Sequence, residues 1–139
     1  MRALLLAFAL VACTTPAPPS PAPPPAGSSY LSGTRWIMED VQASPHYPTM
    51  NFEAARASGF DGCNQWFAGV AHDGESLRFG PVGTTRRACE AGSAGAVERR
   101  FLAILNATRF AHYDQDALVL LDAEQRQIGR FRADASERR

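Results

Sequence analysis

The polar side chains with the greatest potential for chemistry form one short run, Thr84-Thr85-Arg86-Arg87. Hydroxyl and guanidinium groups side by side can receive a carboxylate or a phosphate. The competing interpretation is an ordinary strand whose alternate residues face solvent, and we favour it. Thr84 and Arg86 therefore remain candidate ligand-binding residues, and no catalytic role is assigned to the run.

The other titratable residues predict no active site. His46, His72 and His112 fall in an expected loop, turn and strand, and none has the spacing of a metal-ligand pair. Asp114 and Asp116 flank an expected hairpin tip. Carboxylates there are exposed to water, and we expect a solvated turn rather than an acid–base pair. No nucleophile elbow, phosphate-binding loop or dinucleotide fingerprint is present. We expect a protein that is not an enzyme and has no metal or cofactor.

Length and charge narrow the class of protein. The chain has 139 residues, with 14 basic and 14 acidic side chains, so no net field attracts nucleic acid. After removal of a targeting segment, there is room for one domain with its own core. The sequence does not indicate an oligomeric state.

The N-terminus has the pattern of a secretory signal. Arg2 supplies a positive charge, residues 3–12 are apolar, and the run ends at Cys13. Ten apolar residues are too few to span a bilayer. The ending resembles the bacterial lipobox, in which cleavage leaves an acylated cysteine at the new N-terminus. We therefore predict a signal peptide over residues 1–12 and a lipid on Cys13.

Residues 13–29 form the expected lipidated tether, because prolines dominate and large apolar side chains are absent. In polyproline II conformation it would span roughly 50 Å. Thr14, in place of Asp after the lipidated cysteine, implies sorting to the outer membrane, with the domain facing the periplasm. The domain is expected over residues 30–133, followed by a polar tail over residues 134–139.

Short runs rich in β-branched and aromatic residues recur about every ten residues, as in an antiparallel sheet. We expect strands over 35–41, 49–53, 56–60, 66–71, 76–79, 82–87, 109–113, 118–121 and 127–131. One amphipathic helix is expected around Val97, Phe101, Ile104 and Leu105, with Ser93 as its N-cap. The predicted fold class is mainly β (α+β): a small antiparallel barrel or half-barrel of about eight strands with one packed helix.

A set of small and polar residues in the domain resembles the signature of META/HslJ-like domains. The set is Gly59, Gly62, Cys63, Asn64, Thr85, Arg86 and Cys89. Arg87 departs from the family, which often has Met there. Together with the opening strand, the helix and the closing hairpin, the resemblance extends over about residues 31–131.

The resemblance has structural and functional implications. In an exported domain of this kind we expect Cys63 and Cys89 to face one another and oxidise, closing a loop of about 27 residues. A redox-active pair is the less favoured alternative, since the Cys-x-x-Cys spacing is absent. The resemblance also implies links to heat shock and to tolerance of antibiotics such as novobiocin.

Three functional hypotheses follow. The favoured one is a non-enzymatic envelope lipoprotein that binds a hydrophobic ligand or a protein segment, with Trp36 and Trp66 as candidate ligand contacts beside Thr84 and Arg86. The second is a structural or assembly partner, similar to a pilotin, of an outer-membrane complex. The third and least favoured is an enzyme that uses the Thr84–Arg87 run.

Overall fold

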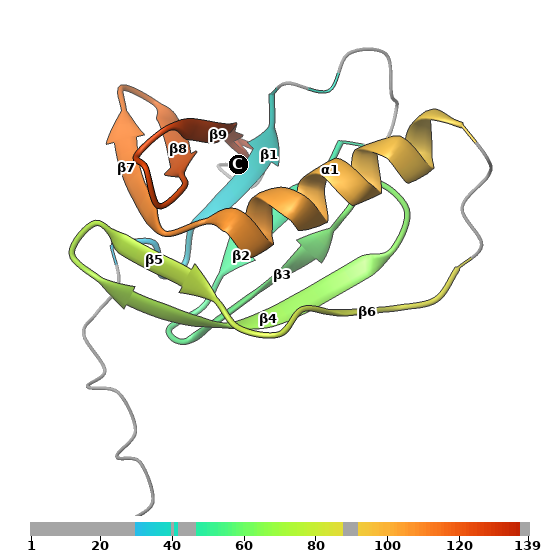
Figure 1. Cartoon of the computed structure of the whole chain (residues 1–139), viewed down its shortest axis with the longest axis horizontal. Coiled ribbons are helices and arrows are strands. Elements are labelled where there is room, and N and C mark those ends of the chain that lie inside the picture. Colours follow the sequence, from blue (N-terminus) through green and yellow to red (C-terminus); the bar gives the residue numbers. More distant parts are fainter. Residues whose placement is uncertain (1–29, 40, 42–46, 88–91, 137–139) are drawn as a thin grey trace, which may run out of the picture.

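The computed structural model describes residues 30–39, 41, 47–87 and 92–136. Nine strands and one helix occur within them (Figure 1). In chain order they are β1 (Arg35–Met38), β2 (Thr49–Phe52), β3 (Arg56–Phe60), β4 (Gln65–Asp73), β5 (Ser76–Phe79), β6 (Gly83–Thr84), α1 (Ser93–Ala107), β7 (Phe110–Asp114), β8 (Ala117–Leu121) and β9 (Gln127–Ala133).

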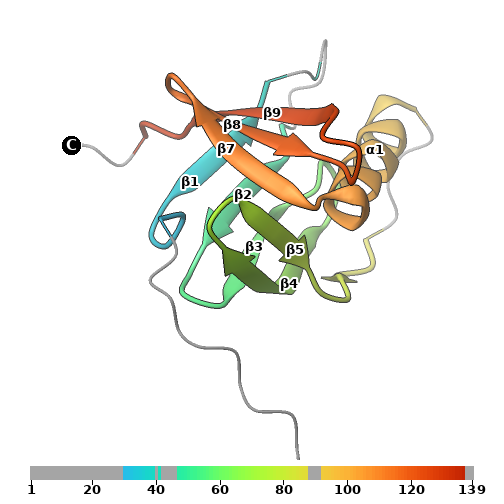
Figure 2. The same cartoon turned by 60° about the vertical axis from the view of Figure 1, so that its left-hand side comes forward.

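The strands form one antiparallel sheet that curls into a ring. Its order is β3-β2-β1-β9-β8-β7-β5-β4-β6, and an additional pairing joins β3, at one end of the row, to β4, which lies next to the other end. The long strand β4 pairs with β3 on one side and with both β5 and β6 on the other. The narrowest seam lies between β5 and β7, where the register holds only Ser76 opposite Phe110. Figure 2 shows the curl.

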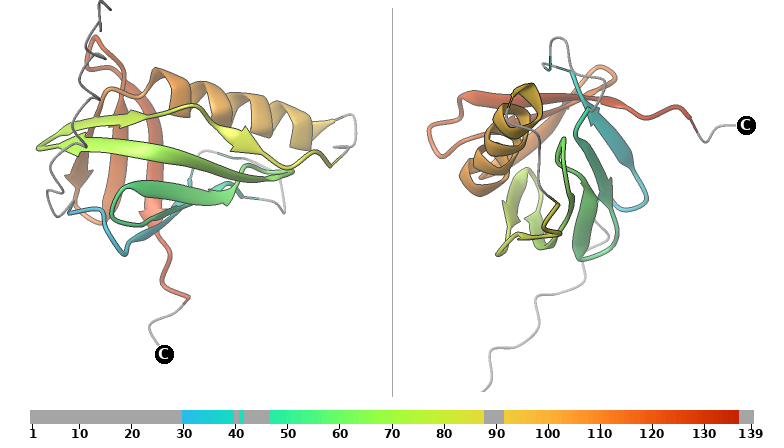
Figure 3. Two further views of the ribbon diagram at one scale, coloured as in Figure 1. Left: turned by 90° about the horizontal axis from the view of Figure 1, so that it is seen from below. Right: turned by 90° about the vertical axis from the view of Figure 1, so that its right-hand side faces the viewer.

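Helix α1 covers the side of the ring between β9 and β5 (Figure 3). Its apolar stripe points inward, and Phe101 and Leu105 are fully buried. Phe101 packs edge-to-face against Trp66 at 5.4 Å and against Phe131 at 6.3 Å. Edge-to-face packing stabilises a pair of aromatic rings beyond the free energy gained from burying their surface. The middle of the ring is therefore filled by interlocking side chains.

The expected fold class is confirmed as a mainly β antiparallel sheet with one helix. Most strand ends agree within one or two residues, which is the usual uncertainty of such boundaries. Residues 40, 42–46 and 88–91, which include Asp40, His46 and Cys89, lie outside the described part of the chain, as do residues 1–29 and 137–139.

Three expected boundaries are wrong, for physical reasons. Strand β1 ends at Met38 rather than at residue 41, because Met38 N donates to Pro48 O and proline has no N–H to return the bond. The expected strand over 82–87 is reduced to β6, because side chains take over the pairing after Thr84. The N-cap of α1 is Gly92, since Ser93 is already helical.

Candidate functional site

The corner between β3 and β4 brings most of the signature residues together. Asp61 is fully buried, and its Oδ1 accepts hydrogen bonds from the N–H groups of Cys63 at 2.9 Å and Asn64 at 2.6 Å. Gly62 has φ 105°, and a Cβ there would lie 2.7 Å from Val97 Cγ1 on α1. The corner therefore requires glycine both for its backbone conformation and for its contact with the helix.

Asn64 connects three separate parts of the chain at this corner. Its Oδ1 accepts hydrogen bonds from Arg87 N at 2.7 Å and from Thr85 Oγ1 at 3.2 Å. Its Nδ2 donates to Glu98 Oε1 at 3.2 Å on α1. Thr85 Oγ1 also accepts from Gln65 N at 3.1 Å, in the place of a strand carbonyl. A single buried amide thus joins the corner, the segment after β6 and the helix.

Replacing this amide tests the role of the corner. Asn64→Ala is expected to lower the free energy of unfolding by about 2 kcal/mol, because the mutation removes several hydrogen bonds and leaves their partners poorly satisfied. The matched control is Asn106→Ala on the exposed face of α1, which is expected to change stability by less than about 0.5 kcal/mol. Urea unfolding measures both, and equal stability of the two variants would contradict this role.

Cys63 lies at the same corner and is only partly buried. Its Sγ is 3.9 Å from Arg87 O, in the segment that leads toward Cys89. The predicted Cys63–Cys89 disulfide stays a prediction, because Cys89 is outside the described residues.

The four candidate ligand contacts from the sequence do not share one surface. Trp66 is 1% exposed, and its Nε1 donates to Thr49 O at 3.0 Å inside the ring. Trp36 is also buried, and its Nε1 donates to Thr34 Oγ1 at 2.8 Å. Thr84 and Arg86 are exposed, on β6 and just beyond it. The signature residues Thr85 and Arg86 are neighbours in the chain, and the Thr85 hydroxyl bonds to Asn64 and Gln65 at the corner.

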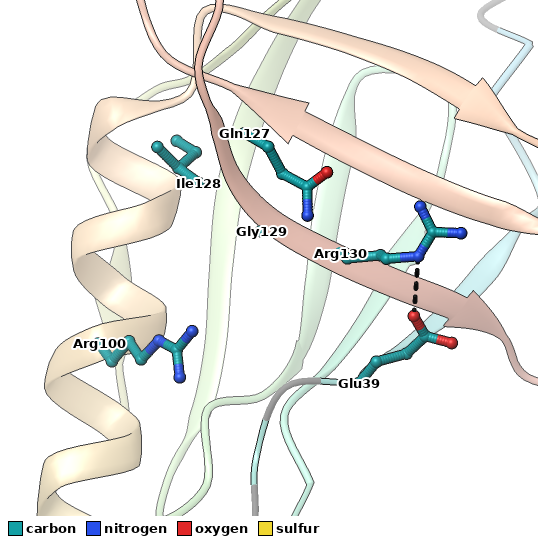
Figure 4. A pocket seen from close by; sticks show the side chains of 6 residues that line it. All are labelled: Glu39, Arg100, Gln127, Ile128, Gly129 and Arg130. Carbon is teal, nitrogen blue, oxygen red and sulfur yellow. Dashed lines mark ion pairs between the residues drawn. The ribbon is translucent and has the colours of Figure 1, made fainter.

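A hollow of about 300 Å³ lies between α1 and β9 (Figure 4). Its lining residues are Glu39, Arg100, Gln127, Ile128, Gly129 and Arg130. Arg130 is already engaged, with Nε 3.1 Å from Glu39 Oε2 and Nη1 2.6 Å from Asp114 Oδ2. This mostly polar lining does not offer the apolar cavity that an acyl chain requires.

A cluster of aromatic side chains occupies the end of the ring where the chain enters the domain. We call it the aromatic end and define it by Tyr30, Trp36, His72 and Tyr113. The Tyr30 ring lies 4.7 Å from His72 and 5.1 Å from Tyr113, and Tyr113 lies 5.5 Å from Trp36. The Tyr30 hydroxyl donates to Ala111 O at 2.9 Å, and the Tyr113 hydroxyl donates to Tyr30 O at 3.3 Å.

The tyrosines of the aromatic end remain partly open to solvent. Tyr30 is 40% exposed and Tyr113 is 43% exposed. Burial raises the pKa of both phenols, with Tyr113 and Glu75 adding to the effect at Tyr30. Burial also lowers the pKa of His72, against the opposing influence of Asp73. The rings are therefore uncharged at neutral pH, and they present aromatic surface rather than ionised groups.

Sequence reasoning did not bring these residues together. Tyr30 lies at the junction with the tether, and His72 was placed in a turn rather than in β4. The Tyr30 hydroxyl bond to Ala111 spans 81 residues along the chain. In the sequence, the position of Tyr113 next to an acidic hairpin tip was the only local indication that this tyrosine is exposed.

The described residues contain no group of three or more His, Cys, Asp or Glu side chains arranged to hold a metal ion. Their helix is too short and too polar to be a candidate membrane span.

The fold and the corner together define a class of small domain. In this class, a curled antiparallel sheet is covered by one helix, and a glycine-containing corner is bonded to that helix. The META domain model matches residues 29–135, and the chain belongs to this family. No curated protein matches the chain.

Comparison with known structures supports the same fold. A protein from Burkholderia xenovorans, determined by NMR, has a TM-score of 0.63 at 22% identity, covering 88% of this chain and 98% of its own. A DUF4847 family protein from Bacteroides vulgatus has a TM-score of 0.58 at 12% identity, covering 78% of this chain and 97% of its own. At these identities the likeness concerns the fold alone.

Proposed function

We propose that the chain is a non-enzymatic lipoprotein of the bacterial envelope, held in the outer membrane by a lipid on Cys13. Its META domain binds a segment of an envelope protein at the aromatic end. A role of this kind agrees with the stress response or antibiotic tolerance that the family resemblance implies.

The observation that carries the proposal is the exposure of Tyr30 and Tyr113 side by side. Tyrosine is enriched at protein interfaces because it offers a large, rigid apolar body with a polar tip. Here the tips are held by Ala111 O and Tyr30 O, so the rings are fixed before any partner arrives. A preorganised surface loses little conformational entropy on binding.

A protein segment suits the domain better than a lipid inside the ring. Trp66, Phe101 and Phe131 are each at most 1% exposed and pack against one another. An acyl chain would have to displace these contacts, and close-packed interiors resist such insertion. The surface of the aromatic end requires no such rearrangement.

Photo-crosslinking in cells tests the proposal. A photoreactive phenylalanine analogue in place of Tyr113 is expected to give one dominant adduct with an envelope protein. Phe67 provides the control position, because it is 51% exposed but lies over Gly83 on the wall of the ring. Absence of an adduct at position 113, or the same adducts at both positions, would contradict binding at the aromatic end.

A further inference from the structure

We propose that the segment recognised at the aromatic end is basic, with arginine or lysine side chains placed against Tyr30 and Tyr113. The inference rests on the proposed function and specifies the chemistry of its partner. It follows from the charges that surround the aromatic end.

Three hairpin turns at this end of the ring carry acidic residues. Glu53 lies in the β2–β3 turn. Asp73 ends β4 and Glu75 lies in the turn that follows, while Asp114 ends β7 and Asp116 lies in the β7–β8 turn. The β4–β5 and β7–β8 turns project on the same side of the molecule, near the start of the described chain (Figure 1). The turns therefore form an acidic border around exposed aromatic rings.

Specific contacts place the β4–β5 turn beside the tyrosines. Glu75 O accepts a hydrogen bond from Ala111 N at 2.8 Å, while Ala111 O accepts one from the Tyr30 hydroxyl. Glu75 and Tyr30 thus flank the same residue of β7. Asp73 directly follows His72, whose ring contacts Tyr30. At least two carboxylates consequently adjoin the aromatic surface.

Neighbouring arginines compensate only part of this acidic charge. Arg130 pairs with Asp114. Arg56 is the first residue of β3 and directly follows the turn that holds Glu53. Among the described residues, Asp73, Glu75 and Asp116 have no salt bridge. Arg35 and Arg132 also lie at this end of the ring, where Arg132 faces Ala117 and Arg35 O accepts a hydrogen bond from Asp134 N. Arg86, Arg99 and Arg126 lie on the segment after β6, on α1 and in the β8–β9 turn.

Aromatic faces and carboxylates recognise the same chemical group. A guanidinium or ammonium is attracted to the face of a tyrosine ring and, separately, to nearby carboxylates. Complementary charge also steers a partner toward the surface before contact. A basic peptide segment satisfies both conditions.

The same charges disfavour two other occupants. An anionic lipid surface attracts basic segments, and the carboxylates around Tyr30 would oppose its approach. The chain's own residues 14–29 contain no charged side chain, so they do not complement the border. A separate basic protein segment remains as the occupant.

Peptide titration of the full chain, followed by NMR, tests the inference. The probes are three nine-residue peptides in which glycine alternates with arginine, glutamine or glutamate. The arginine peptide is expected to shift the signals of Tyr30, His72 and Tyr113, with affinity that falls as salt rises. Glu75→Gln combined with Asp116→Asn is expected to weaken its binding about fivefold. Glu124→Gln, in the β8–β9 turn away from Tyr30, is the matched control and is expected to have little effect.

The possible results separate the two proposals. Equal binding of the glutamine and arginine peptides at these residues would overturn the basic-segment inference and leave protein binding at the aromatic end intact. Unchanged affinity in the double variant would also overturn the inference. Failure of all three peptides to shift these signals would overturn the basic-segment inference, and the crosslinking result at position 113 would then decide the proposed function separately.

Discussion

Gly59→Ala is expected to lower the free energy of unfolding by about 4 kcal/mol, the largest effect of any single substitution considered for this domain. A Cβ at position 59 would lie 2.1 Å from Thr49 O, which is a backbone atom of the neighbouring strand β2. Because backbone cannot rotate away as a side chain does, β2 and β3 would have to separate. The substitution therefore strains the sheet itself.

The same displacement would break two further interactions of Thr49. Its carbonyl accepts from Trp66 Nε1 at 3.0 Å, and its Oγ1 accepts from Phe60 N at 3.0 Å. Trp66 would then be left with a buried N–H without an acceptor, which is costly. Overpacking and lost hydrogen bonds both contribute to the expected loss.

Gly69→Ala is the matched control for this substitution. Gly69 lies on β4, has no atom within 4 Å of the added Cβ and is exposed. Its replacement is expected to change stability by less than about 0.5 kcal/mol. Urea unfolding of both variants measures the difference in stability. A Gly59→Ala protein as stable as Gly69→Ala would contradict the expected strain between β2 and β3.

Loss of the predicted Cys63–Cys89 disulfide is expected to have the second largest effect. Closing a loop of about 27 residues restricts the unfolded chain and is expected to stabilise the domain by about 3.5 kcal/mol. Such a bond would fasten the β3–β4 corner to the entry of α1, which Asn64 already joins through Arg87 N and Glu98. Cys63→Ser is expected to remove this stabilisation.

Reducing conditions provide the internal control for this prediction. Dithiothreitol is expected to lower the stability of the wild-type chain to that of Cys63→Ser and to leave the variant unchanged. Cys13→Ser is expected to respond to dithiothreitol as the wild type does, because Cys13 is predicted to carry lipid rather than to pair. A wild-type protein that is insensitive to reduction would refute the disulfide.

Gly59→Ala and Cys63→Ser both change residues of the family signature, and both are expected to lower the stability of the domain strongly. Gly59 lies against the backbone of Thr49 and Gly62 lies against the side chain of Val97, so neither position has room for a Cβ. Asp61 and Asn64 supply the side-chain acceptors and donors that the irregular corner lacks from its backbone. These residues are best explained by packing and bonding within the domain, which leaves binding to other surfaces.

The local elements of this domain were readable from sequence because local physics specifies them. Short runs of β-branched and aromatic residues located the strands, and three- and four-residue spacing located α1. The errors occurred where distant residues intervened. Pro48 ends the pairing of β1, and Thr85 and Asn64 replace the backbone partners that a longer β6 would need.

The positions of the functional candidates were decided by tertiary structure. Trp36 and Trp66 satisfied the sequence criteria for ligand contacts, yet closure of the ring buries both. Tyr30 and Tyr113 meet because the chain entering the domain crosses the end of β7, and no local pattern encodes a contact between residues so far apart.

The sequence by itself therefore determined the family, the mainly β fold with one helix, and the residues of the corner, since these depend on periodicity and on residue types at fixed spacing. Only the tertiary structure decided which aromatic residues are buried, which face solvent, and which acidic turns surround them. The physical reason is that hydrogen bonding along a strand sets its direction, whereas the closure of the sheet sets which strand ends lie together.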